Sequence, residues 1–96
     1  MSFKLGSAAV VIGLALAGAA QAECFADYKA KQDNPLRLHY GVVALPDTAC
    51  SKTAAKGVIT PRLQRGGWTL LNVLSIFGPE GLAERKANAG AYYLSF

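Results

Sequence analysis

The feature that most limits what this chain can fold into is its N-terminal segment, which is typical of an export signal. Lys4 precedes an uncharged apolar stretch over residues 8–20, and Ala20-Gln21-Ala22 provides the small residues that a signal peptidase requires. The apolar stretch is shorter than the ~20 residues of a membrane-spanning helix, which disfavours the alternative of a membrane anchor. We therefore expect a signal peptide over residues 1–22, cleavage between Ala22 and Glu23, and one small domain over residues 23–96.

The two cysteines of the chain, Cys24 and Cys50, both lie in this expected mature domain. Two cysteines in an exported chain favour a single disulfide. Such a bridge would contribute about 3–4 kcal/mol in the loop-entropy model, comparable with the ~3–5 kcal/mol net that a core of this size supplies. A redox-active pair is the alternative, but the CxxC spacing of such pairs is missing.

Hydrophobic periodicity predicts an α+β domain. We expect a short N-terminal helix over residues 23–32, strands over 36–45, 68–77 and 91–96, and a main helix over 51–65 that Pro61 kinks near Gly57 or breaks in two. These elements predict a two-layer sandwich with a three-stranded mixed sheet, in which the last strand runs antiparallel to the 68–77 strand. The connection from Gly78 to Gly90, with a short helix around residues 82–86, is long and is therefore a candidate functional segment.

Three resemblances accompany this pattern. Gly67-Trp68 followed by an apolar strand, and the aromatic end over residues 92–96, resemble a small domain of unknown function. The strand–helix–strand order is similar to half of the sporulation-related repeat domain, which would imply binding to bare glycan strands of the cell wall. The mature chain, with residues 33–42 reading DNPLRLHYGV, also resembles short uncharacterised exported proteins of alphaproteobacteria, which implies no activity.

The residues needed for catalysis are not grouped in this sequence. His39 is the only histidine, Ser75 lacks a nucleophile-elbow motif, and two cysteines are too few for a structural zinc site. We therefore expect no enzyme activity, no metal and no cofactor. The net charge of +4 is spread along the chain, which argues against a nucleic-acid partner.

The remaining function class is a periplasmic or secreted binding module, without membrane insertion after cleavage. We expect it to bind an envelope protein or a cell-wall polymer through a strand face with Arg37, His39 and Tyr93, or through the 78–90 segment. The alternatives are a cell-wall glycan binder and, less favoured, a small redox protein or enzyme. Four aromatic residues would either stack on sugars or build the core: Tyr40, Trp68, Tyr92 and Tyr93. An exposed edge strand would also permit a homodimer.

Overall fold

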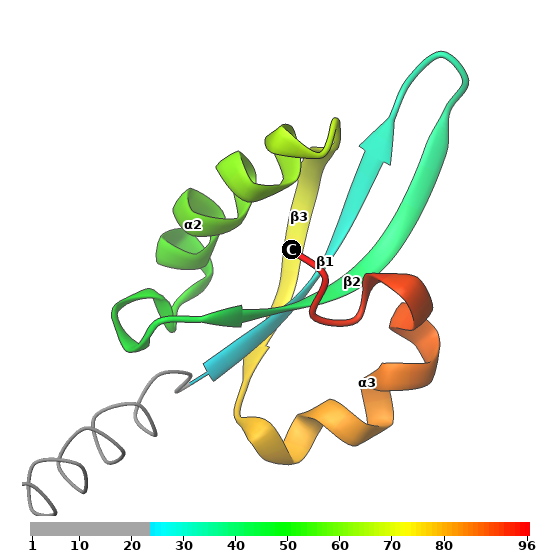
Figure 1. Cartoon of the computed structure of the whole chain (residues 1–96). Coiled ribbons are helices and arrows are strands. Elements are labelled where there is room, and N and C mark those ends of the chain that lie inside the picture. The colour runs from blue at the N-terminus through cyan, green and yellow to red at the C-terminus, as the bar shows by residue number, and fades with distance from the viewer. Residues whose placement is uncertain (1–23) are drawn as a thin grey trace, which may run out of the picture.

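A three-stranded antiparallel sheet forms the centre of the computed structural model, which describes residues 24–96 (Figure 1). The elements in chain order are β1 (Cys24–Gln32), β2 (Arg37–Leu45), α2 (Lys52–Arg65), β3 (Thr69–Phe77) and α3 (Leu82–Ala89). This confirms a small α+β fold. The expected signal peptide and its cleavage position between Ala22 and Glu23 lie outside the described residues. Over residues 24–96, no helix is long and apolar enough to cross a membrane.

The central strand is β1, and the strand order is β2-β1-β3. Cys24 pairs with Leu45 at one end of the β1–β2 hairpin, and Gln32 pairs with Arg37 at the other. On its other side β1 pairs antiparallel with β3, with two register shifts that place bulges in β3. The sheet is therefore antiparallel, and the expected mixed sheet was wrong, because the N-terminal segment rather than the C-terminal one supplies the third strand.

The segment in which we expected a short N-terminal helix forms β1 instead. Cys24 to Tyr28 and Ala30 are all buried, because both faces of this central strand are covered. Only Cys24, Ala26, Tyr28 and Ala30 belong to the core under α2, and this spacing of two is that of a strand. Phe25, Tyr28 and Lys29 also match the spacing of one helical face, but Lys29 is exposed. Hydrogen bonding to strands on both sides decides between the two patterns.

The main helix, α2, is confirmed at close to its expected bounds. The Ser51 side chain caps its N-terminus by accepting a hydrogen bond from the Ala54 amide at 3.2 Å. The helix runs without a break through Pro61. Of the two expected effects of Pro61, the division into two short helices was therefore wrong, while the kink near Gly57 stays a prediction. Pro61 lies on the exposed side of α2, while the opposite side is buried against the sheet. This burial keeps the helix intact although Pro61 provides no amide hydrogen.

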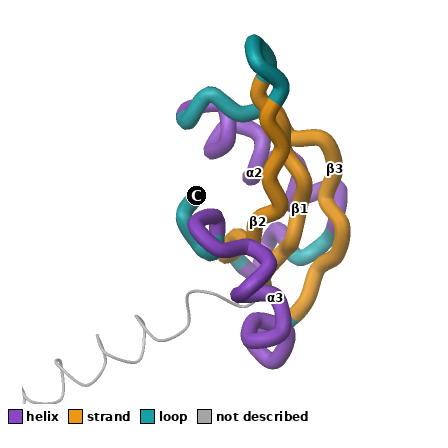
Figure 2. Tube along the Cα trace, turned by 90° about the vertical axis from the view of Figure 1, so that its right-hand side faces the viewer, coloured by secondary structure: helices purple, strands orange, loops and turns teal. Residues whose placement is uncertain are grey.

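The two helices lie against opposite faces of the sheet (Figure 1). Tyr28 of β1 packs in the core under α2, whereas its neighbour Asp27 points to the other face and bonds Arg85 of α3. Figure 2 shows the strands and both helices from the side, and α3 adds a partial third layer to the expected two. The core lies between α2 and the sheet, where Ala55, Ile59 and Leu63 pack on Tyr28 and Leu45. The 78–90 connection contains α3, as expected for a short helix there. This helix packs mainly against β2.

The C-terminal residues, in which we expected a strand, form a 3-10 turn over Gly90–Tyr92 and then an irregular segment. Gly90 and Leu94 have positive φ angles of 55° and 56°, which interrupt an extended chain. The segment still contacts the sheet, because the Leu94 amide donates to the Val42 carbonyl at 2.8 Å and Tyr93 forms an isolated parallel bridge with Val42. It therefore covers part of the free edge of β2.

Candidate functional site

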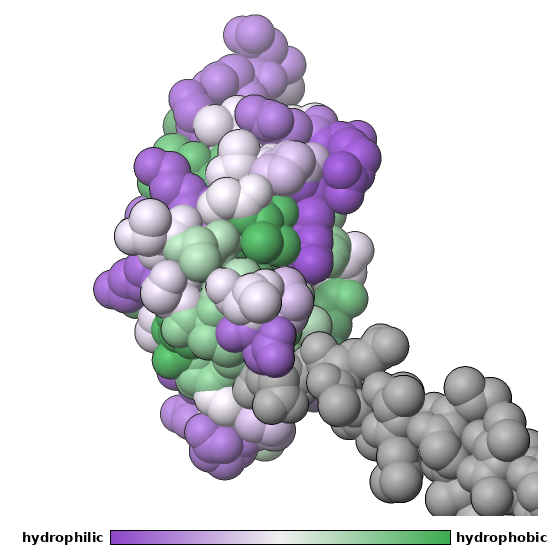
Figure 3. All heavy atoms as spheres, turned by 90° about the vertical axis from the view of Figure 1, so that its left-hand side faces the viewer, coloured by the Kyte–Doolittle hydropathy of each residue, from purple (hydrophilic) through white to green (hydrophobic). Residues whose placement is uncertain are grey.

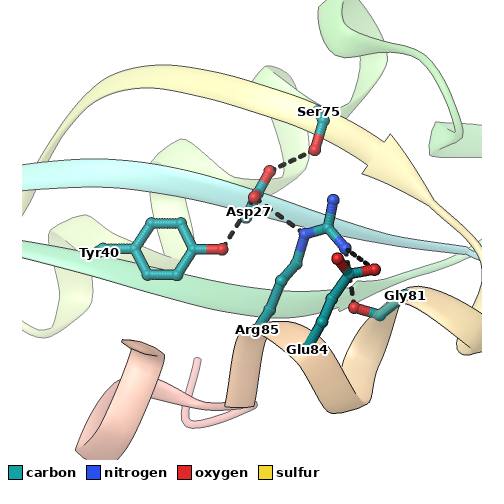
Figure 4. A network of polar contacts seen from close by, with 6 residues as sticks. All are labelled: Asp27, Tyr40, Ser75, Gly81, Glu84 and Arg85. Atoms are coloured by element: carbon teal, nitrogen blue, oxygen red, sulfur yellow. Dashed lines mark hydrogen bonds and ion pairs between the residues drawn. The ribbon is translucent and has the colours of Figure 1, made fainter. Parts of the chain in front are cut away.

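A network of polar side chains surrounds Asp27, a buried residue of β1 (Figure 4). Ser75 of β3 donates to one carboxylate oxygen of Asp27 at 2.6 Å. Tyr40 of β2 and Arg85 of α3 donate to the other oxygen at 2.8 and 3.1 Å. One carboxylate thus joins all three strands to α3.

The hydrogen bonds around Asp27 decide its charge state. Burial alone would raise the pKa of Asp27, but the hydrogen bonds from Ser75, Tyr40 and Arg85 outweigh it and lower that pKa below its usual value. Burial and the bond to Asp27 raise the pKa of Tyr40 to about 12. Asp27 is therefore ionised and Tyr40 protonated at neutral pH, with both carboxylate oxygens occupied.

Arg85 is held by three further contacts besides Asp27. Its Nη1 atom donates to the Gly81 carbonyl at 2.8 Å and lies 3.4 Å from the exposed carboxylate of Glu84. Its guanidinium also stacks over the Phe77 ring, with 4.0 Å between Cζ and the ring centroid. Because every group of this cluster has an internal partner, we interpret the cluster as the attachment of α3 to the sheet.

His39 is surrounded by aromatic rings on the face of the sheet that α2 covers. Tyr92 stacks on its imidazole with ring centroids 3.8 Å apart, and Trp68 meets it edge-on at 4.3 Å. The ring of Phe96 lies parallel to the imidazole at 5.9 Å. His39 Nε2 and the Tyr28 hydroxyl are 2.9 Å apart, whereas Nδ1 is buried without a hydrogen-bond partner among residues 24–96.

This aromatic environment favours the neutral imidazole. Burial lowers the pKa of His39 below its usual value, and burial also raises the pKa of the Tyr28 hydroxyl. The side chain of His39 is covered by Tyr92, Trp68 and Phe96, so it has little access to a substrate. Within residues 24–96, no group of three or more histidine, cysteine or carboxylate side chains could hold a metal ion.

The three residues of the expected interaction surface do not share one exposed face. Arg37 is exposed at the end of the hairpin, while only 8% of His39 is exposed. Tyr93 lies on the other side of the C-terminal segment, where it lines a hollow beside α3 with Lys86. The ring that contacts His39 belongs to Tyr92, the next residue in the chain.

The aromatic residues considered as a sugar platform are also engaged internally. Trp68 is buried, Tyr92 stacks on His39, and the Tyr40 hydroxyl binds Asp27. Sequence reasoning missed the Asp27 cluster because it assigned Asp27 to a solvated helix. The signal that was available is a lone acidic residue between the apolar side chains of Phe25, Ala26 and Tyr28.

Cys24 and Cys50 form the expected disulfide, with their Cα atoms 5.9 Å apart. The bridge joins the first residue of β1 to the segment that precedes α2. Cys24 is buried, and Cys50 is exposed. The bond therefore closes the β1–β2 hairpin at its base.

A surface with both polar and apolar side chains lies along β3, the strand at the sheet edge next to α2. A groove of about 240 Å³ separates this strand from the first turns of α2. Figure 3, which views the molecule from the side of α2, shows hydrophobic surface exposed between hydrophilic side chains. The lining residues are Lys52, Thr53 and Lys56 of α2 and Leu70, Leu71, Asn72 and Val73 of β3.

Comparisons of this chain with protein-family models, with curated proteins and with solved structures found no match. The fold and the geometry of the site are therefore the basis for inferring function.

Proposed function

We propose that this protein is an exported, disulfide-closed module without enzyme activity, which binds a partner in the cell envelope. The observation that carries the proposal is the internal use of the groups that could do acid–base chemistry. Asp27 accepts three hydrogen bonds from side chains, and His39 is covered by aromatic rings. Both groups are engaged within the domain, which leaves the exposed surface as the functional part.

Export is supported by the Cys24–Cys50 disulfide together with the signal-like sequence over residues 1–22. Disulfides persist in oxidising compartments such as the periplasm and are rare in the cytosol. The bridge closes a loop of 26 residues, and small domains with a limited core commonly need such a bridge for stability.

The experiment is cross-linking in intact producing cells, followed by fractionation and mass spectrometry of the adducts. We expect the protein in the envelope or periplasmic fraction, with residues 1–22 removed, oxidised cysteines and a reproducible adduct with one envelope component. An unrelated exported protein of similar size and charge, produced at the same level, is the control. A cytosolic protein with reduced cysteines, or the same adducts as the control protein, would contradict the proposal.

A further inference from the structure

We propose that the groove between α2 and β3 binds an extended acidic segment of the partner, which adds as a strand to the free edge of β3. This inference rests on the proposed binding function and names the surface and the chemistry of its ligand. Extended segments commonly bind in this way, because backbone hydrogen bonds give affinity and side-chain pockets give specificity.

The two edges of the sheet differ in how far other segments of the chain cover them. The edge of β2 is partly covered by the C-terminal segment, through the bridge between Val42 and Tyr93 and the hydrogen bond from Leu94. Within residues 24–96, β3 pairs with β1 alone. Its outer edge therefore offers backbone donors and acceptors that no described segment uses.

The groove beside this edge has an apolar floor and a cationic rim. Leu71 is a large apolar side chain with half of its surface exposed, and it lines the groove beside Leu70 and Val73. Lys52 and Lys56 belong to α2 and line the other side of the groove. Such a surface fits a segment whose apolar side chains cover Leu71 and whose acidic side chains reach the two lysines.

The charge of the groove is what selects an acidic occupant. No carboxylate lines the groove, and neither Lys52 nor Lys56 has an ion pair with a residue in the described part of the chain. Two uncompensated cations beside a free strand edge attract anionic side chains and repel basic ones. The segment to be bound should therefore carry aspartate or glutamate at alternate positions.

The same charges disfavour a second copy of this chain as the occupant. Antiparallel pairing of β3 with β3 of another molecule would place both α2 helices on the same face of the joined sheet. Lys52 and Lys56 of the two copies would then approach one another, and like charges in close contact are destabilising. The bulges in β3 further limit regular pairing, so we expect a short segment beside residues 70–73.

The test measures fluorescence anisotropy with a labelled peptide of alternating glutamate and valine, on the purified oxidised protein. A peptide with lysine in place of glutamate controls for charge, and an acidic peptide with a central proline controls for backbone pairing. The variant Lys52→Glu/Lys56→Glu reverses the charge at the rim of the groove. The matched control Arg37→Glu/Arg65→Glu makes the same charge change at two other exposed positions, which do not line the groove.

We expect the acidic peptide to bind, the basic and proline-containing peptides to bind at least tenfold more weakly, and only Lys52→Glu/Lys56→Glu to lower the affinity by tenfold or more. Equal loss in both variants, or equal binding of the proline peptide, would overturn the inference. Concentration-dependent dimerisation that the peptide does not disrupt would identify a second copy as the occupant and would also overturn it. If cross-linking in cells still yields a specific envelope adduct with Lys52→Glu/Lys56→Glu, the binding function stands and this site is wrong.

Discussion

Gly41 shows how one residue sets the shape of the core. It pairs with Tyr28 across β1 and β2, and the phenol ring lies directly over it. A Cβ atom at position 41 would overlap the Tyr28 hydroxyl, and the ring atom Cζ would lie only 2.5 Å from it. The missing side chain is thus the space through which Tyr28 reaches His39.

We predict that Gly41→Ala lowers the free energy of unfolding by about 1–3 kcal/mol, because the well-packed Tyr28 ring must move. The control is Gly57→Ala in α2, where an added Cβ meets no neighbouring atom within 4 Å. This change should raise stability by up to ~1 kcal/mol through helix propensity. Urea denaturation measures both variants, and equal effects of the two would contradict the explanation.

A second residue-scale prediction concerns the titration of His39. Because burial lowers the folded-state pKa of His39, the unfolded chain binds a proton at higher pH than the folded chain does. The resulting stabilisation is full above the ordinary value of 6.5 and is lost as the pH falls from there toward the folded pKa. The slope is at most about 1.4 kcal/mol per pH unit.

The measurement is urea denaturation between pH 8 and pH 5, with His39→Gln as the variant that cannot titrate. We expect the stability of the wild type to fall in the acidic part of this range and the slope to be smaller in the variant. Equal slopes in the two proteins would show that His39 does not carry the pH dependence.

Among the elements, α3 depends on a single polar attachment to the sheet. We predict that Asp27→Asn lowers the free energy of unfolding by about 1.5–3 kcal/mol, the range for hydrogen bonds to a charged group. Hydrogen exchange of the amides in residues 82–89 should increase first, because α3 loses its ion pair through Arg85. Exchange that rises equally across β1 and α3 would contradict this assignment.

The control for this prediction is Glu84→Gln, since Glu84 contacts the same arginine but its side chain is 74% exposed. An exposed ion pair of this kind contributes about 0–1 kcal/mol. The pH dependence provides a second check. The lowered pKa of Asp27 gives the wild type a stabilisation that is lost as the pH falls below about 3.8, and Asp27→Asn should lack that loss.

The elements also show which parts of the fold could be predicted from the sequence. α2, β2 and β3 were predicted nearly to the residue, because their patterns and their turns agree: Ser51 caps α2 and Gly66-Gly67 follows it. The predictions for the two ends of the domain were wrong. The nine residues of β1 fit a helix or a strand, and only pairing with both neighbours distinguishes the two.

The candidate site was less predictable than the fold for the same reason. The disulfide followed from composition and export context alone. The Asp27 cluster joins residues 48 and 58 positions apart, so its existence depends on the strand order. With residues 23–32 assigned to a helix, Asp27, Ser75 and Arg85 could not be brought together, and His39 was expected on an exposed face.

At the scale of the whole molecule, stability depends on the disulfide as much as on the core. We predict that Cys24→Ser/Cys50→Ser loses about 3–4 kcal/mol, the loop-entropy value for a closure of this length. Because a core of this size supplies only ~3–5 kcal/mol, the variant should lose about half of its stability and should melt at a clearly lower temperature than the wild type. Circular dichroism during urea and thermal unfolding measures the change, and a loss below about 1 kcal/mol would show that the core suffices alone.

The position of the disulfide at the base of the hairpin has a consequence for proteolysis. The exposed turn over residues 33–36 lies inside the loop that Cys24 and Cys50 close. A protease that cuts this turn would separate β1 from the rest of the backbone, yet the sulfur–sulfur bond would still hold the two fragments in one molecule. The nicked protein should migrate as a single species without reductant and as two species with it, and the hairpin would tolerate a break in the main chain at its tip.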